Sequence, residues 1–238
     1  MLAPSCQQSN ESVSLELVPS YEEGYDEELG QDASVFSVTL VGGYSTDVLS
    51  VNLNLPYVSV SEIDDPPRPD ECGPGDITLD VDAYLFGDYA DGAYGGLVGG
   101  VKFENGDEKD GLGTGGTDVT LGVLGGYAAE PITLFGRLTH TFVGEPKGRD
   151  YQDVWSVQAG VSGRWREDNS AGVFVEGRES IDPEDESIVT LYAYYRRELP
   201  RRMHLTVMPY TGLSDTAPDF GIVVSWGIGF DIPSAEDQ

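Results

Sequence analysis

The sequence has few basic residues and no long apolar segment. Of its 238 residues, 13 are lysine or arginine and 42 are aspartate or glutamate, so the formal net charge is -29 at pH 7. A surface this acidic repels a phosphate backbone, which excludes nucleic acid as a partner. A membrane-spanning helix needs about twenty consecutive apolar residues, and the chain contains no such run. The composition therefore argues against a nucleic-acid-binding protein and against a helical membrane protein.

Cysteine and histidine are also scarce. Cys6 and Cys72 form a possible disulfide in an oxidising compartment, while lipidation of Cys6 or two free thiols remain open alternatives. A serine hydrolase needs a histidine beside its serine, and neither His140 nor His204 has a serine at a convincing spacing. No segment matches an EF-hand loop, so we name no metal ligands. We therefore expect no catalytic residue, no bound metal and no cofactor.

Glycine is abundant, with 31 residues, and apolar residues alternate with polar ones over short runs. In the segment 77–83 the odd positions are apolar and the even positions polar, which a pleated strand sends to opposite faces. This period of two predicts an all-β protein. The expected strands number about twelve and cover residues 12–21, 34–44, 47–59, 76–86, 92–103, 117–128, 131–143, 152–165, 170–178, 187–197, 202–213 and 219–231.

Aromatic spacing separates a membrane barrel from a soluble sandwich or a lipocalin-like barrel, which show the same alternation. Trp155 and Trp165 share one face of an expected strand and lie ten residues apart. At a tilt of about 40° this interval spans about 25 Å along the membrane normal, the distance between the two aromatic girdles of an outer-membrane barrel. Phe220 and Phe230 repeat the interval on the last strand, where Trp226 lies on the same face. These five residues are our candidate membrane girdle.

The connections between the expected strands alternate in length. Turns such as 44–47 and 128–131 are short, whereas segments such as 60–75 and 104–116 are longer and mostly acidic. Outer-membrane barrels have short periplasmic turns and longer extracellular loops. We therefore expect both termini at the periplasmic side.

Ionisable residues occupy the strand face opposite the apolar one. Buried in a sandwich core, each would cost several kcal/mol unless paired. Inside a barrel they contact water or one another, so we expect them to line or constrict the lumen. The candidate lumen residues are Asp80, Asp82, Arg137, Arg164, Glu176, Arg178 and Arg196.

These observations predict a closed antiparallel transmembrane β-barrel. The barrel is expected to occupy residues 12–231, with an N-terminal extension over 1–11 and a C-terminal tail over 232–238. The expected location is the bacterial outer membrane after removal of an export signal, with outer-membrane lipid as a partner.

Two glycine-rich stretches resemble the putative MetA-pathway of phenol degradation family. One is Gly73-Pro74-Gly75-Asp76-Ile77-Thr78-Leu79, which follows Leu53-Asn54-Leu55-Pro56-Tyr57-Val58. The other runs from Asn105-Gly106-Asp107 through Gly111-Leu112-Gly113-Thr114-Gly115 to Thr117-Asp118-Val119. The resemblance implies an outer-membrane location and a transporter-like barrel. It does not imply phenol as the solute.

The functional expectation is a narrow channel or transporter-like pore for small solutes. Twelve strands fall between barrels filled by side chains and wide porins, so inward side chains decide whether the lumen is open. Small hydrophobic or aromatic solutes are the candidate cargo. One alternative is a structural or adhesive surface barrel with envelope protein partners, and another is a lipid-modifying enzyme at the rim near His140.

Overall fold

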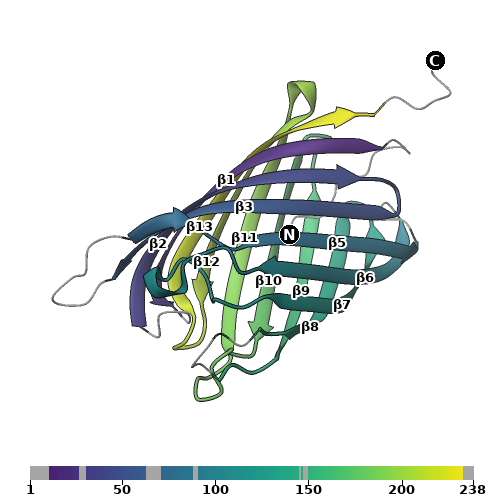
Figure 1. Cartoon of the computed structure of the whole chain (residues 1–238). Coiled ribbons are helices and arrows are strands. Elements are labelled where there is room, and N and C mark those ends of the chain that lie inside the picture. The colour runs from purple at the N-terminus through teal and green to yellow at the C-terminus, as the bar shows by residue number, and fades with distance from the viewer. Residues whose placement is uncertain are drawn as a thin grey trace.

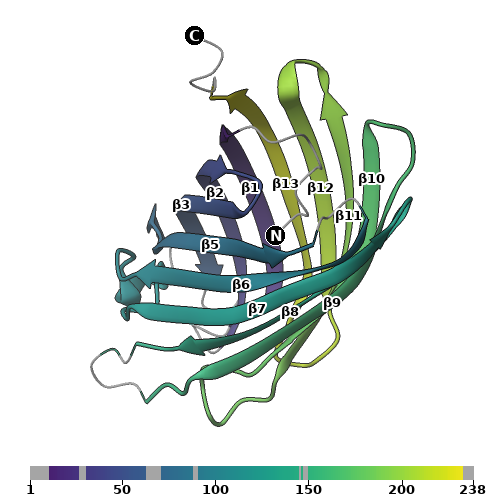
Figure 2. The same cartoon turned by 90° about the vertical axis from the view of Figure 1, so that its right-hand side faces the viewer.

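The computed structural model describes residues 11–26, 31–62, 71–87, 91–144, 146 and 150–232. Within these ranges the strands form one antiparallel sheet that curves into a barrel (Figures 1 and 2). Two single-turn 3₁₀ helices, η1 (Glu108–Asp110) and η2 (Pro200–Arg202), lie in connections. No helix of the described residues is long and apolar enough to cross a membrane. The strands are β1 (Ser12–Asp26), β2 (Gln31–Ser45), β3 (Leu49–Glu62), β4 (Glu71–Pro74), β5 (Ile77–Phe86), β6 (Gly92–Phe103), β7 (Asp118–Ala129), β8 (Ile132–Phe142), β9 (Val154–Arg164), β10 (Asn169–Arg178), β11 (Ile188–Leu199), β12 (Met203–Gly212) and β13 (Pro218–Asp231).

The barrel closes between its first and last strands. Ser12 of β1 is the register partner of Asp231 on β13 and of Ser45 on β2. Each remaining long strand pairs with its neighbours in the sequence, except that β3 pairs with β5 as well as with β2. Closure satisfies the backbone groups that an open sheet edge would leave unpaired in lipid. The prediction of a closed, twelve-stranded antiparallel barrel is confirmed.

One strand, β4, is additional to the twelve that we predicted. It lies within the segment 60–75, which we expected to be a loop. β3 pairs with β5 only as far as Asn54, so the backbone beyond it needs another partner. β4 supplies this partner, with Tyr57 opposite Pro74 and Val60 opposite Glu71. The four residues therefore form a short extra strand at one end of the barrel.

The two ends of the barrel differ. The start of β1, the end of β13 and the turns that join β2–β3, β5–β6, β7–β8, β9–β10 and β11–β12 lie at one end, which we call the terminal end. The longer connections lie at the opposite end, the loop end. The first expected strand was too short, because β1 continues to Asp26 at the loop end. The expected extension 1–11 and tail 232–238 fall almost entirely outside the described residues.

The polarity of the wall is inverted relative to a soluble protein. Outward side chains are apolar and solvent-accessible, for example Leu97 at 50%, Leu121 at 55% and Val157 at 53% exposure. Their neighbours in sequence point inward and are mostly polar, such as Thr120 and Gln158, which line the interior. An apolar belt of this extent is incompatible with a water-soluble barrel but is the surface that lipid covers. The soluble sandwich and lipocalin alternatives therefore do not fit.

Candidate functional site: the barrel lumen

A cavity of about 550 Å³ occupies the loop-end half of the barrel interior. We call it the vestibule. This volume lies in the range of small-molecule binding sites, about 300–1,000 Å³. Its wall is mostly polar, with hydroxyl, amide and charged side chains. The residues that line it are Glu22, Lys102, Thr114, Asp118, Thr120, Arg137, Thr139, Thr141, Val143, Val154, Ser156, Gln158, Glu176, Arg178, Ile181, Ile188, Thr190, Tyr192, Tyr210, Thr216 and Pro218.

Arg137 and Asp82 form an ion pair across the interior. Arg137 projects from β8 and Asp82 from β5, and β6 and β7 lie between these strands. Nη2 of Arg137 lies 2.7 Å from both carboxylate oxygens of Asp82. The side chains are 17% and 7% exposed, respectively, so water screens the pair less than it would at a surface. The pair connects two parts of the wall that do not touch through the sheet.

The other predicted lumen residues have different surroundings. Asp80 accepts hydrogen bonds from Asn54 Nδ2 at 2.8 Å and from Thr78 Oγ1 at 3.4 Å. Glu176 accepts from Gln158 Nε2, and Arg178 lines the vestibule beside it.

Two of the predicted arginines lie nearer the terminal end. Arg196 donates from Nε to Glu198 Oε1 on its own strand at 2.7 Å. Arg164 is the last residue of β9 and is exposed there. The structure therefore joins Asp82 with Arg137, places Glu176 near Arg178, and leaves Arg164 and Arg196 away from the vestibule.

Aromatic rings form a ladder along the inner wall. The Phe174 and Tyr192 rings are stacked, with centroids 4.6 Å apart and an interplanar angle of 6°. Tyr192 also packs on Tyr210 at 5.0 Å, and Phe174 meets Phe135 edge-on at 6.0 Å. Such pairs stabilise one another beyond simple burial. The ladder links β8, β10, β11 and β12 and presents the Tyr192 and Tyr210 side chains to the vestibule.

The terminal-end half of the interior is more densely filled. Tyr94, Phe174 and Tyr194 are 6%, 6% and 7% exposed, and Thr206 is 1% exposed. Tyr194 lies against Gly172 of the neighbouring strand, where an added Cβ would come within 2.6 Å of the ring. Glycines on inward faces therefore make room for aromatic side chains from adjacent strands.

A buried polar cluster also lies in the terminal-end half. His204 Nε2 is 3.3 Å from Glu16 Oε2, and Ser225 Oγ donates to the same oxygen at 2.7 Å. The serine hydroxyl thus points to the carboxylate and not to the imidazole, which is not the arrangement of a hydrolase nucleophile. His140 faces outward between Phe142 and Trp155, with ring centroids at 4.7 and 4.5 Å.

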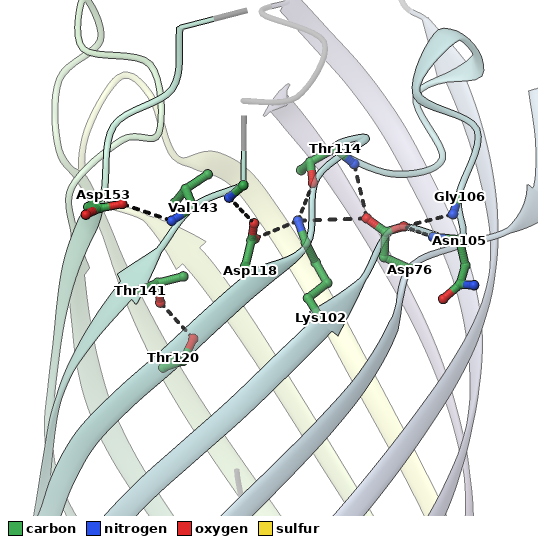
Figure 3. Close-up of polar contacts among 11 residues, drawn as sticks. Asp76, Lys102, Asn105, Gly106, Thr114, Asp118, Thr120, Thr141, Val143 and Asp153 are labelled. Atoms are coloured by element: carbon green, nitrogen blue, oxygen red, sulfur yellow. Dashed lines mark hydrogen bonds and ion pairs between the residues drawn. The ribbon is translucent and has the colours of Figure 1, made fainter. Parts of the chain in front are cut away.

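The connection between β6 and β7, residues 104–117, folds against the barrel mouth. We call it the inner loop. The carboxylate of Asp76 accepts hydrogen bonds from the backbone N–H groups of Asn105 and Gly106, both at 2.8 Å, and of Thr114 at 3.1 Å (Figure 3). Lys102 lies beside this anchor: Nζ is 2.8 Å from Asp118 Oδ2 and donates to the Thr114 hydroxyl.

The predicted girdle residues all point outward. Trp155, Trp165 and Trp226 are each 48% exposed, and Phe220 and Phe230 are 49% and 51% exposed. Trp155 lies at the loop end of β9, and Trp165 directly follows the terminal end of that strand. Their role as membrane girdles remains a prediction.

The possible disulfide is not tested by the structure. Cys72 is exposed on β4, and its Sγ accepts a hydrogen bond from the Tyr57 hydroxyl at 3.6 Å. Cys6 lies outside the described residues.

Several interior residues were missed by the sequence analysis. Glu16, Glu22, Lys102 and Asp118 all point inward, and the alternation that identified Asp82 would have identified them. Asp76 lies on the same face of the expected strand 76–86 as Asp80 and Asp82, but the alternation could not indicate that it anchors the loop that follows β6. Only the folded structure brings these segments together.

No family model and no curated protein matches this chain. Solved structures do match it. The translocator domain of the autotransporter NalP from Neisseria meningitidis aligns with a TM-score of 0.61 and 11% identity, over 95% of this chain and 90% of that chain. The KdgM porin aligns with a TM-score of 0.58 and 6% identity, over 91% of this chain and 99% of that chain. At these identities the similarity establishes the fold alone, so the resemblance to the MetA-pathway family stays a prediction, whereas the fold is that of an outer-membrane β-barrel.

Proposed function

We propose that the chain is a narrow channel for small solutes in the bacterial outer membrane, oriented with both termini in the periplasm. The observation that carries the proposal is the vestibule, a polar cavity of about 550 Å³ inside a wall whose outer face is apolar. A barrel that serves only as a scaffold has no need of such a cavity. The KdgM porin, whose fold this chain shares, supports a pore by analogy of architecture.

Charge is distributed so that the channel favours cations and neutral solutes over anions. The vestibule is lined by three basic residues, Lys102, Arg137 and Arg178, and three acidic ones, Glu22, Asp118 and Glu176. The chain as a whole carries a formal charge of -29. The charges of the vestibule lining therefore balance, and it is the excess of carboxylates over the whole chain that attracts cations and repels anions, more strongly at low ionic strength.

The predicted lumen residues act at the floor of the vestibule in this proposal. Arg137 reaches across to Asp82 and so occupies part of the cross-section, and Glu176 and Arg178 extend the charged surface along β10. The paired charges of Arg137 and Asp82 produce an electric field across the solute path, and their hydrogen bonds also connect β8 to β5. Small hydrophobic or aromatic solutes remain the candidate cargo, and the tyrosines of the ladder are the groups that an aromatic ring would meet.

Single-channel recording in planar bilayers tests the proposal. We expect discrete conductance steps and, in a KCl gradient, a reversal potential that shows K⁺ preference over Cl⁻. Arg137→Ala should increase the conductance. The matched control is Arg197→Ala, which removes the same charge from an exposed position on β11. A correctly folded barrel that never conducts would instead favour the structural or adhesive role.

A further inference from the structure

The inner loop does not simply extend into solvent. Its residue Leu112 is 7% exposed and packs with Ala33 and Val60, beside Val35 and Val58. These four residues belong to β2 and β3, on the side of the barrel mouth beyond β5, whereas the loop starts from β6. The loop therefore crosses β5 at the barrel mouth and inserts an apolar side chain among residues of β2 and β3.

Asp76 fixes the position of the loop. A carboxylate that accepts three backbone N–H bonds holds these groups more firmly than neutral acceptors would. Two of the bonds go to residues 105 and 106 at the start of the loop and the third to Thr114 near its end. The two halves of the loop are thus tied to one point at the start of β5.

The glycines of the loop allow this close approach. A Cβ on Gly113 would come within 2.6 Å of Asp76 Oδ1, and one on Gly73 would come within 2.8 Å of Leu112 Cδ1. Gly111 and Gly115 have φ values of 67° and 72°, which other residues adopt at a cost. The glycine-rich stretches that carry the family resemblance are therefore the residues that let the loop lie against Asp76.

The inner loop also borders the vestibule. Thr114 belongs to the loop and lines the cavity, together with Lys102 and Asp118 at the ends of the flanking strands. Lys102 contacts both Thr114 and Asp118 (Figure 3). The loop thus covers the β2–β5 side of the mouth, and the open space remains on the other side.

We infer that the inner loop sets the size limit for solutes that enter the barrel, with Asp76 as the positioning residue and Leu112 as the apolar anchor. This inference rests on the proposed channel function. Release of the loop from Asp76 would free the space over β2, β3 and β5 and enlarge the entrance.

The experiment compares Asp76→Ala and Leu112→Ala with two controls, Asp215→Ala and Leu213→Ala. Both control residues are exposed in the turn between β12 and β13, so they remove the same groups without touching the loop. Each purified barrel is reconstituted in planar bilayers, and polyethylene glycols of graded mass are added to find the largest that enters the pore. We expect a larger cutoff for the two loop variants and an unchanged cutoff for the controls.

A second measurement does not depend on conduction. Trypsin recognises Lys109 within the loop, and its cleavage there is followed in folded, detergent-solubilised barrels by mass spectrometry. Because cleavage requires local opening, release of the anchor should raise the rate about tenfold or more. Asp76→Asn, which keeps one acceptor oxygen, should fall between the parent and Asp76→Ala.

The outcomes separate the two proposals. If no barrel conducts, including the released variants, then the channel function and the size limit both fail. If the parent conducts and cleavage accelerates without a change in cutoff, only the inference about the loop fails. If cleavage does not accelerate, Asp76 is not the anchor and the inference is also overturned.

Discussion

Loss of Arg137 should leave a buried carboxylate without its cationic partner, and its cost can be worked out from the geometry. Nη2 lies 2.7 Å from both oxygens of Asp82, and the two side chains are 17% and 7% exposed. With an effective dielectric constant of about 20, charges about 3 Å apart attract by about 5–6 kcal/mol before desolvation is counted. Most of this attraction offsets the cost of taking both groups out of water. Removal of one partner leaves that cost without compensation, and we expect Arg137→Ala to lower the free energy of unfolding by about 3 kcal/mol.

A double-mutant cycle separates the pair from its surroundings. Asp82→Ala should destabilise the barrel because Arg137 loses a partner, but the double variant should be less destabilised than the sum of the two single variants. We expect a coupling energy of about 1.5–3 kcal/mol, as for hydrogen bonds between charged groups. The free energies are measured from reversible urea unfolding in detergent or lipid, followed by tryptophan fluorescence.

The control is Arg197→Ala, because Arg197 is exposed on the outer face of β11. It should change the unfolding free energy by less than about 0.5 kcal/mol. Additive single-variant effects, or an Arg137→Ala barrel as stable as the parent, would refute the view that the pair braces the wall. A coupling that disappears in 1 M salt would show that the pair is hydrated and screened.

Three other outcomes follow from the structure. Gly172→Ala should destabilise the barrel by about 1–3 kcal/mol, because the new methyl group would lie 2.6 Å from the Tyr194 ring, whereas Gly177→Ala on the same strand has 3.8 Å to its nearest neighbour and should be tolerated in urea unfolding. Arg164→Ala removes a positive charge at the terminal end and should raise the K⁺ preference, measured as a reversal potential, without loss of heat-modifiable gel migration. Among single-tryptophan variants, the one that keeps Trp226 should be quenched most by lipids brominated near the chain ends, because Trp226 lies within β13 whereas Trp155 and Trp165 lie at the two ends of β9. That result would remove Trp226 from the candidate girdle, and equal quenching of all three would contradict the assignment of Trp155 and Trp165 to the two girdles.

The strands were predictable because their two faces meet different solvents. Lipid selects apolar residues at every second position and the interior selects polar ones, so the alternation persists along each strand. The prediction was wrong where this contrast ends. β1 continues to Asp26 through Glu22 and Glu23, which looked like loop residues because both faces there are polar. Strand pairing extends beyond the apolar belt, and hydropathy does not record that extension.

The short strand β4 and the inner loop were not predictable for a different reason. Each depends on backbone groups from distant segments: β4 pairs with the end of β3, and the loop binds Asp76 through three backbone N–H groups. A backbone donor has no signature in the sequence. Only the glycines around these contacts were visible in the sequence, and a glycine does not show which backbone groups it allows to approach.

The pair of Asp82 and Arg137 is another contact between distant segments that could not be predicted from the sequence. The period of two placed both residues on the inward face, but it could not indicate that they are partners, because β6 and β7 lie between their strands. The partnership depends on what those two strands present to the interior. Gly122 lies on the inward face of β7, and a Cβ at this position would come within 2.3 Å of the backbone oxygen of Leu138, the residue that follows Arg137. Substitution of Gly122 by a larger residue should therefore separate the pair and destabilise the barrel without any change in charge, and double-mutant cycles in that background should show the coupling between Asp82 and Arg137 lost.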